Sequence, residues 1–250
     1  MKPSFLRKLH LPWRAPKRLS SQARRELSQE VAQKAVSFGA SLAGVADTDA
    51  LCASPSHRSQ RVRWPPDARS AIVLALAHPP QQMPLDCWDG RPGGTPGNRR
   101  LIRCAATLVR WLKQRHGIDA RTMPYQIKGG GVFLKDAAVM AGLGVMGRNN
   151  LVVTPEFGPR IRLRVVLTTV RLSPTDPLDN FTPCEGCPAF CRHACPQDAF
   201  RSGSYDQRCC LCQMWRDESG ARSNESDGIS YCRVCELACP VGKQTVPPTF

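Results

Sequence analysis

Two cysteine motifs decide the expected fold of the C-terminal third of this chain. They are Cys184-Glu-Gly-Cys187-Pro-Ala-Phe-Cys191-Arg-His-Ala-Cys195-Pro196 and, further on, Cys232-Arg-Val-Cys235-Glu-Leu-Ala-Cys239-Pro240. The stretch from Cys184 to Cys239 contains ten of the thirteen cysteines, a density that a soluble domain rarely shows unless something binds the thiols. Two or three residues between thiolates let one loop wrap an iron–sulfur cube, and a terminal Cys-Pro carries its sulfur to a neighbouring cluster. The spacing therefore predicts two [4Fe–4S] clusters.

The expected ligands cross over between the two cysteine motifs. The first cluster takes its thiolates from Cys184, Cys187, Cys191 and Cys239. The second takes them from Cys195, Cys232 and Cys235 and needs one more. Three neighbouring cysteines can supply it, and of Cys209, Cys210 and Cys212 we favour Cys210.

Two other uses of the thiols compete with this interpretation. Paired CxxC motifs can bind tetrahedral zinc, which does not account for two Cys-Pro endings or for ten thiols. Disulfides require an oxidising compartment, and no apolar run follows the basic residues at the start of the chain as it would in a secretory signal. A cytoplasmic location is therefore expected.

The net charge of +15 is concentrated at the start of the 250-residue chain. Residues 1 to 25 hold eight lysines and arginines and no acid, so the other 225 residues carry 27 basic and 20 acidic side chains, or +7. This basic N-terminal arm can contact nucleic acid or an acidic protein, or it can be a solvated tail. The longest apolar run, Ala71 to Ala77, is too short to span a bilayer, so no membrane partner is expected.

Residues 26 to 176 alternate between helical and strand-like patterns. Apolar residues at helical spacing predict helices over 27–38, 101–112 and up to Val139, with stops at Gly39, Gly117 and Gly142. Strands are expected over 41–46 and 71–77. The proline- and glycine-rich stretch 79–98 predicts a long loop without regular structure.

A hairpin is expected from Leu151–Val153 and Ile161–Val170, joined by Thr154-Pro-Glu-Phe-Gly-Pro159. Ser173 to Pro177 is the expected linker, which places a domain boundary near residue 176 and a thiol-rich domain over 177–250. The latter is too small to fold without its clusters.

Two motifs carry a resemblance to a known family. Ala141-Gly-Leu-Gly-Val-Met-Gly-Arg-Asn149 and the loop 154–159 precede the double cysteine array in that order. In this combination the chain resembles the epoxyqueuosine reductases and their relatives, the corrinoid reductive dehalogenases, over roughly residues 25 to 242. The resemblance implies an α+β fold, with a nitroreductase-like α/β sandwich domain that binds cobalamin and a small ferredoxin-like domain that holds two [4Fe–4S] clusters.

The resemblance also implies where a corrinoid would be held. Cobalt would have no protein ligand below it, in agreement with the lack of an Asp-x-His-x-x-Gly sequence. The residues expected to bind the cofactor are Gly129, Gly130, Gly142, Gly144, Gly147, Arg148 and Asn149. The run Gly129 to Gly131 lets backbone approach a bulky ligand, although a flexible connection explains it nearly as well.

The chain departs from the family at the proton donor. Epoxyqueuosine reductases have a proton-donating aspartate where this chain has Gly129, so the family's substrate does not transfer directly. The catalytic candidates nearby are Asp136, Tyr125 and Lys135, with Lys128 beside them. Each can equally be an ordinary surface side chain.

Two functional hypotheses follow. In the first, the protein is a corrinoid-dependent iron–sulfur reductase that takes electrons from a low-potential donor such as ferredoxin or flavodoxin and reduces a small molecule or a nucleotide, with RNA left open. In the second, it is a non-catalytic electron-transfer protein or redox subunit. An RNA-binding module with structural clusters is the weakest alternative, because only 6% of residues are aromatic.

Overall fold

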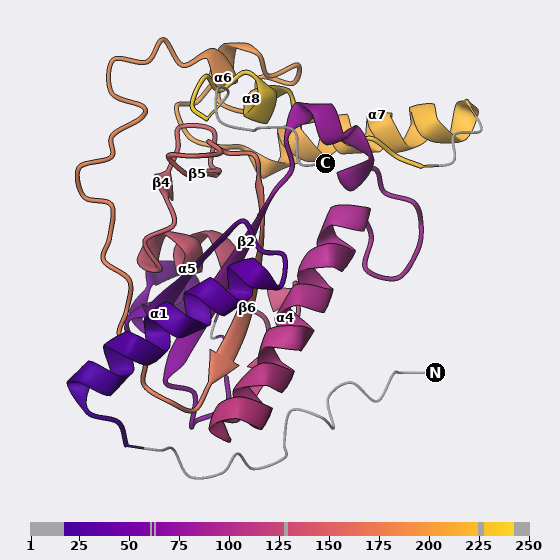
Figure 1. Ribbon diagram of the computed structural model, residues 1–250. Helices are drawn as coiled ribbons and strands as arrows, with labels where there is room; N and C mark the ends of the chain where they lie inside the picture. The colour runs from indigo at the N-terminus through magenta and orange to yellow at the C-terminus, as the bar shows by residue number, and fades with distance from the viewer. Residues whose placement is uncertain (1–17, 61, 63, 128–129, 225–227, 243–250) are drawn as a thin grey trace. The chain divides into compact units, whose positions relative to one another are not determined.

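The computed structural model describes residues 18–60, 62, 64–127, 130–224 and 228–242 (Figure 1). Most of the basic arm, together with Lys128 and Gly129, lies outside the described residues. The chain packs into two compact units, each described by itself below. Unit 1 comprises Met1–Leu76, Leu101–Leu143 and Leu163–Pro177, and unit 2 comprises Ala77–Arg100, Gly144–Arg162 and Leu178–Phe250.

The main sheet has four strands in the order β1-β2-β6-β3. They are β1 (Leu42–Asp47), β2 (Ser70–Ala77), β6 (Ile161–Thr168) and β3 (Ala120–Thr122). β1 runs antiparallel to β2, and β3 runs antiparallel to β6. The strands expected over 41–46 and 71–77 are thus confirmed within a residue at each end.

One face of this sheet is covered by α1 (Ser21–Ser37) and by α4 (Pro96–His116) from Leu101 onward. Figure 1 shows both helices in front of the strands. Alternate residues of β2 enter the core on this side, where Ile72, Leu74 and Leu76 meet Leu101 and Leu108. The alternation follows from the two-residue repeat of a strand, and it buries the apolar stripes of the two helices.

A helix approaches β1 closely on the opposite face of the sheet. Gly44 pairs with Val73 in the register of β1 and β2, so the two lie on the same face. A Cβ on Gly44 would lie 2.2 Å from the carbonyl oxygen of Ala141, at the end of α5 (Leu134–Met140). This close approach of helix and strand depends on the missing side chain. Two short helices, α2 (Thr48–Ala53) and α3 (Pro55–Ser59), follow β1.

The helices of unit 1 stop where the glycines predict. Gly39, Gly117 and Gly142 have φ of 107°, 65° and 66°, the left-handed region that a residue with a Cβ rarely adopts. The pattern of apolar residues and glycine stops therefore located three helices correctly.

Unit 2 contains a two-stranded sheet of β4 (Val145–Met146) and β5 (Val152–Val153) and four further elements. These are η2 (Pro80–Leu85), α6 (Phe190–His193), α7 (Gln207–Ser223) and α8 (Val234–Leu237). The loop expected over 79–98 thus includes a 3-10 helix and the first residues of α4.

The hairpin expected from 151–153 and 161–170 is wrong. β5 pairs with β4 rather than with β6, which belongs to the other sheet. Thr154 and Gly158 exchange two backbone hydrogen bonds of 2.9 Å and close the intervening turn on itself. A closed turn redirects the chain, so the two flanking segments do not become partners.

The expected linker is bonded into unit 1. The Thr175 N–H donates to the Val45 carbonyl, and the Thr175 hydroxyl accepts from the Val45 N–H, both at 2.9 Å. Residues 173–177 therefore act as an extension of the β1 edge. The domain boundary near residue 176 remains a prediction.

In the described part of the chain, every helix is too short or too polar to cross a lipid bilayer.

The substitution Gly44→Ala tests the close approach of β1 and α5. The added methyl group would collide with backbone that cannot move without shifting α5, and we expect a loss of about 1 to 3 kcal/mol in the free energy of unfolding. Urea denaturation followed by circular dichroism measures it. The control Gly220→Ala lies within α7 with open space around its Cβ, and it should leave stability equal or slightly higher. Equal stability of both variants would contradict the packing described here.

Candidate metal centre

Four cysteines from distant parts of the chain line one cavity in unit 2. Its sulfur-bearing residues are Cys184, Cys187, Cys191 and Cys239, and the rest of its lining is Arg148, Asn149, Val153, Pro183, Phe190, Pro240 and Val241. These cysteines are the four expected to hold the first cluster.

The thiols of this set act on one another electrostatically. Burial raises the pKa of Cys191, and the neighbouring charges of Cys239, Cys184 and Cys187 raise it further. Burial also raises the pKa of Cys239, partly offset by a backbone hydrogen bond and by the charge of Arg160. Removing protons from such a group requires a cation among the sulfurs, which is what bound iron provides.

A second set of thiols gathers around Cys235. Burial, followed by the charges of Cys232, Cys210, Glu236 and Cys195, raises the pKa of Cys235 to about 12. Burial raises the pKa of Cys232 as well, and Cys210 and Cys195 contribute to the shift. These four cysteines are the ones expected to hold the second cluster.

The neighbourhood of Cys210 separates it from the other two candidates for the eighth ligand. The charge of Cys210 contributes to the raised pKa values of Cys232, Cys235 and the Tyr205 hydroxyl. The pKa of Cys209 is raised by loss of hydration and by the charges of Asp206, Cys212 and Cys195. Cys210 therefore interacts with two cysteines of the second set, Cys232 and Cys235, whereas Cys209 interacts with one, Cys195.

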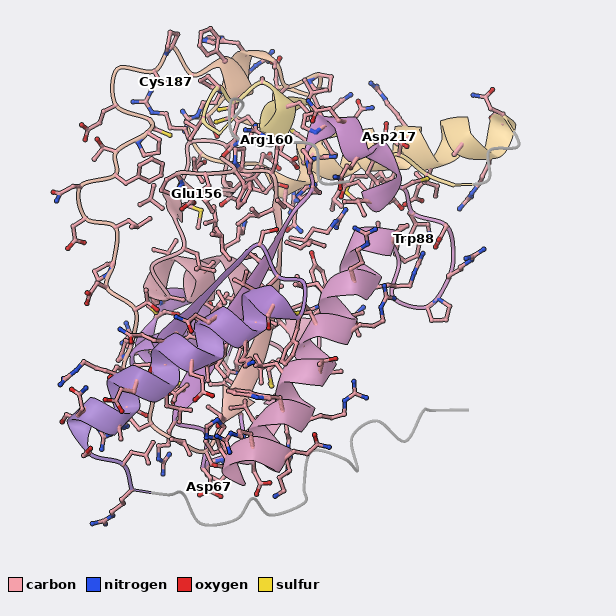
Figure 2. The ribbon with its side chains drawn as sticks, in the orientation of Figure 1. Asp67, Trp88, Glu156, Arg160, Cys187 and Asp217 are labelled. Atoms are coloured by element: carbon pink, nitrogen blue, oxygen red, sulfur yellow. The ribbon has the colours of Figure 1, made fainter. Side chains whose placement is uncertain are left out.

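The arrangement of each set suits a cluster. Each corner iron of a cube takes one thiolate, so the four thiols stand around a group of atoms instead of meeting at one point. Figure 2 shows sulfur atoms gathered beside the short helices α6 and α8. Among the described residues, no three His, Cys, Asp or Glu side chains converge on a position for a single metal ion.

Arg148 and Asn149, expected at the corrinoid, contact the cysteine segments of their own unit. The Arg148 backbone N–H lies 3.5 Å from the sulfur of Cys184, and its guanidinium donates to the Cys187 carbonyl at 3.1 Å. The Asn149 amide donates to the Cys235 carbonyl at 3.3 Å. The two residues thus contact one thiol, that of Cys184, and the backbone of a cysteine from each set.

Arg160 holds the end of the second cysteine motif. Its side chain is 2% exposed, and its guanidinium donates to the carbonyls of Cys239 at 3.2 Å, Glu236 at 3.4 Å and Val241 (labelled in Figure 2). Burial lowers the pKa of Arg160, and the charges of Cys239 and Glu236 oppose this effect. A buried arginine bonded to three carbonyls fixes the turn that carries Cys239.

A buried carboxylate, Asp86, joins three cationic or polar groups in unit 2. It accepts from His78 Nδ1 at 2.6 Å and from Arg162 Nε at 2.7 Å, and it forms an ion pair with Arg233. Asp86 is 7% exposed. Burial tends to raise its pKa, but the hydrogen bond from His78 and the charges of both arginines hold the pKa below its usual value.

Sequence reasoning missed this network and Arg160. Arg162 lies within the strand expected over 161–170, and Arg233 lies inside the Cys232-to-Cys235 motif. An arginine between two expected ligands and a histidine directly after a buried strand were the available signals, and neither indicates its partner.

The predicted catalytic residues lie in unit 1. Asp136, in the first turn of α5, accepts from the Ser54 hydroxyl at 3.4 Å, and that hydroxyl lies 2.8 Å from His57 Nδ1. Burial lowers the pKa of Lys135, and the charge of Asp136 opposes this. Tyr125 is 66% exposed, and the guanidinium of Arg164 lies 5.6 Å from its ring centroid.

At three of the glycines predicted to bind the corrinoid, the packing of neighbouring atoms leaves no room for a side chain. A Cβ on Gly142 would lie 2.2 Å from the Asp176 carbonyl, one on Gly144 would lie 2.4 Å from the Val153 carbonyl, and one on Gly147 would lie 2.6 Å from the Val153 side chain. Gly130 has φ of 82° and Gly129 lies outside the described residues. A role for these glycines at a cofactor stays a prediction.

Comparison with known proteins gives relatives of two kinds. No family model matches the chain. An epoxyqueuosine reductase of Bacillus cereus is 26% identical over 208 residues, which cover 71% of this chain and 49% of that protein. A tetrachloroethene reductive dehalogenase of Sulfurospirillum multivorans is 33% identical over 118 residues, which cover 44% of this chain and 23% of that protein. The chain spans about half the length of the curated epoxyqueuosine reductases that it matches.

Solved structures show the same fold. An epoxyqueuosine reductase with an epoxyqueuosine-modified tRNA-Tyr stem loop matches with a TM-score of 0.64 at 20% identity, over 88% of this chain and 66% of that one. A catabolic reductive dehalogenase in complex with 3-bromo-4-hydroxybenzoic acid matches with a TM-score of 0.63 at 18% identity, over 97% of this chain and 36% of that one. The expected α+β class and the resemblance stated from the sequence are confirmed.

The substitution Asp86→Asn tests the buried network. It would leave Arg162 without its carboxylate and Arg233 with that of Glu236 alone, and we expect a loss of about 3 kcal/mol or more in the free energy of unfolding and weaker iron retention. The urea midpoint and the iron content of anaerobically prepared protein measure these effects. The control Asp89→Asn breaks the more exposed pair with Arg99 in the same segment and should change both quantities much less. Similar losses in the two variants would refute the role given to Asp86.

Proposed function

Since this chain matches the superfamily of epoxyqueuosine reductases and corrinoid reductive dehalogenases, we propose that it is a corrinoid-dependent iron–sulfur reductase. Two [4Fe–4S] clusters in the ferredoxin-like part would deliver electrons to a corrinoid held by a nitroreductase-like sandwich. The substrate would be a small molecule or a nucleotide. The relatives are oxidoreductases by name, but this chain covers only about half of their length, so its own activity is part of the proposal.

One observation carries the proposal. The cysteines that the spacing assigned to two clusters separate into the same two sets in the folded chain. One set shares a cavity, and the other is coupled through Cys235. Thiols brought together from segments this far apart in sequence point to ligation, because spacing within one motif cannot bring Cys239 beside Cys184 or Cys195 beside Cys232.

The clusters would supply single electrons of low potential. The polypeptide itself holds the ligand loops in place, through Arg160 at Cys239, Arg148 at Cys187 and Asn149 at Cys235. These bonds go to backbone carbonyls, so they fix the position of the loops without competing for the thiolates. Hydrogen bonds to the loops around a metal centre set the geometry of its ligands.

A bound corrinoid would supply the reactive metal that accepts these electrons and reduces the substrate. The corrinoid part of the proposal rests on the relatives. A proton must accompany the reduction, and Lys135 is the best-placed donor among the predicted catalytic residues, because burial lowers its pKa toward the range useful for proton transfer. Asp136 is bonded to Ser54, which suits a supporting role, and Tyr125 lies exposed.

A nucleotide within RNA is the substrate class that we favour. One structurally similar epoxyqueuosine reductase is solved with a tRNA stem loop, and this chain has a net charge of +15 that would attract a phosphate backbone. A reducing, cytoplasmic compartment suits thiolate-bound clusters, and a ferredoxin or flavodoxin is the expected type of electron donor.

Iron analysis of single cysteine variants tests the two clusters. Anaerobically reconstituted protein should hold about eight iron atoms per chain, and Cys210→Ser should lower this to about four because the second cluster loses a ligand. The control Cys212→Ser removes an exposed thiol two residues away and should keep the full amount. Zinc in place of iron, or equal iron in the two variants, would refute the assignment.

Cobalamin binding tests the second half of the proposal. We expect reconstituted protein to convert added cob(II)alamin to a base-off form, visible as a shifted absorption band that appears only when the protein is present. Cob(II)alamin mixed with an unrelated protein at the same concentration serves as the control for nonspecific binding. If iron is present and the band does not appear, the protein is an electron carrier or redox subunit instead.

A further inference from the structure

The helix α7 of unit 2 presents one basic face to solvent. It has seventeen residues and none of them is buried. The exposed side chains recur at helical spacing along one side, and we name this set the α7 face: Arg208, Cys212, Trp215, Arg216, Ser219 and Arg222. No acid belongs to this set.

The acids of α7 point elsewhere and are engaged. Asp217 (labelled in Figure 2) accepts from the backbone N–H of Cys232 and from the amide of Gln213, both at 2.8 Å. Glu218 accepts from the hydroxyl of Tyr231 at 2.9 Å. These bonds hold α7 against the segment that carries Cys232, and they leave the arginines to dominate the charge on the other side.

Among the described residues, no guanidinium group of the α7 face forms an ion pair of the kind that joins Arg99 and Arg201 to a nearby aspartate. The charge of Arg208 does act on Asp206, and that of Arg222 acts on Tyr231. Arginine side chains exposed together on one helix face attract a negatively charged partner.

Trp215 stands among these arginines with 60% of its surface exposed. An exposed tryptophan loses favourable burial unless something covers it at times. Tryptophan and arginine are also the residues that most often carry the energy of protein interfaces. The α7 face therefore has the composition of a docking site.

The position of α7 suggests what docks there. Cys210 belongs to the same helix, and Cys232, which is exposed, is bonded through its backbone to Asp217. The proposed second cluster thus lies directly beneath the helix. Since electron transfer slows steeply with distance, a carrier resting on this face would be well placed to reduce that cluster.

We propose that the α7 face is the docking surface of a small acidic one-electron carrier protein. The face from Arg208 to Arg222 is ~20 Å long at 1.5 Å per residue, the scale of the small interfaces that transient redox partners form. RNA would also be attracted by the arginines, but Trp215 is its single aromatic residue, and stacking of successive bases needs several.

The inference rests on the proposed function, because it needs a cluster beside Cys210. In each encounter one electron leaves the reduced flavin or iron–sulfur group of the carrier and enters the second cluster, and no covalent bond of this chain forms or breaks. The carrier then dissociates in its one-electron oxidised form. A high off-rate and electrostatic steering suit such turnover.

The test compares two charge-reversal variants of the reconstituted protein. Arg216→Glu/Arg222→Glu reverses charge on the α7 face, and the control Arg103→Glu/Arg110→Glu reverses the same number of exposed arginines on α4 of unit 1. Both lower the net charge from +15 to +11. A reduced flavodoxin, which is a small acidic flavoprotein, serves as the carrier, and stopped-flow absorbance follows cluster reduction.

We expect the α7 variant to be reduced about tenfold or more slowly than the wild type at low ionic strength, with the difference shrinking as salt is added. The control variant should stay within about twofold of the wild type. A second readout is independent of electron flow: the affinity for oxidised flavodoxin, followed by flavin fluorescence, should fall in the α7 variant and in Trp215→Ala.

Three outcomes would overturn the inference. They are equal slowing in both charge variants, no slowing in either, or loss of affinity for an RNA stem loop in the α7 variant while its reduction by flavodoxin is unchanged. Iron content and the rate of reduction by dithionite separate this inference from the proposed function. Both should be the same in all variants, whereas wild-type protein without iron would mean that the proposed function itself has failed.

Discussion

The close packing of eight cysteine thiols into two sets is the constraint on which unit 2 depends. Burial and the charges of neighbouring groups, three thiols among them, raise the pKa of Cys235 to about 12. Burial and neighbouring thiols raise the pKa of Cys191 in the same way. A bare polypeptide gains little from such contacts, since thiols pack poorly compared with larger apolar groups and repel one another once ionised. The 17-residue helix α7 buries no residue that could compensate. The proposed metal ligation would stabilise this arrangement, because ligand binding becomes folding free energy.

Buried arginines support that arrangement from the other side. Arg160 and Arg233 lose their hydration, which carries a cost, and the structure offsets it with carbonyls and with the carboxylates of Asp86 and Glu236. The planar guanidinium suits this use, because one group can direct several N–H donors at acceptors in fixed directions. The network therefore contributes geometry more than stability, and it positions the loops on which the thiols sit.

Local patterns in the sequence predicted more than long-range ones. Cysteine spacing predicted which thiols share a site, and that assignment stays a prediction. Gly39, Gly117 and Gly142 ended helices as predicted because of their own backbone freedom. The hairpin through Thr154 was mispredicted, since partner choice depends on a turn that closes on itself. The Asp86 network could not be anticipated, because its members are brought together by the fold and no spacing links His78 to Arg233.

Hydrogen bonds and ion pairs between distant segments explain which stretches of chain belong to unit 2. Trp88 exchanges two backbone hydrogen bonds of 2.8 Å with Ile229, Asp86 pairs with Arg233, and Arg160 bonds to Cys239. Each joins an upstream segment, 77–100 or 144–162, to the cysteine region. A fragment starting at residue 178 would bury Arg233 without Asp86 and leave the Cys239 turn without Arg160, two losses that each cost several kcal/mol in known cases. The thiol-rich region therefore packs within unit 2 against two upstream stretches of chain, 77–100 and 144–162.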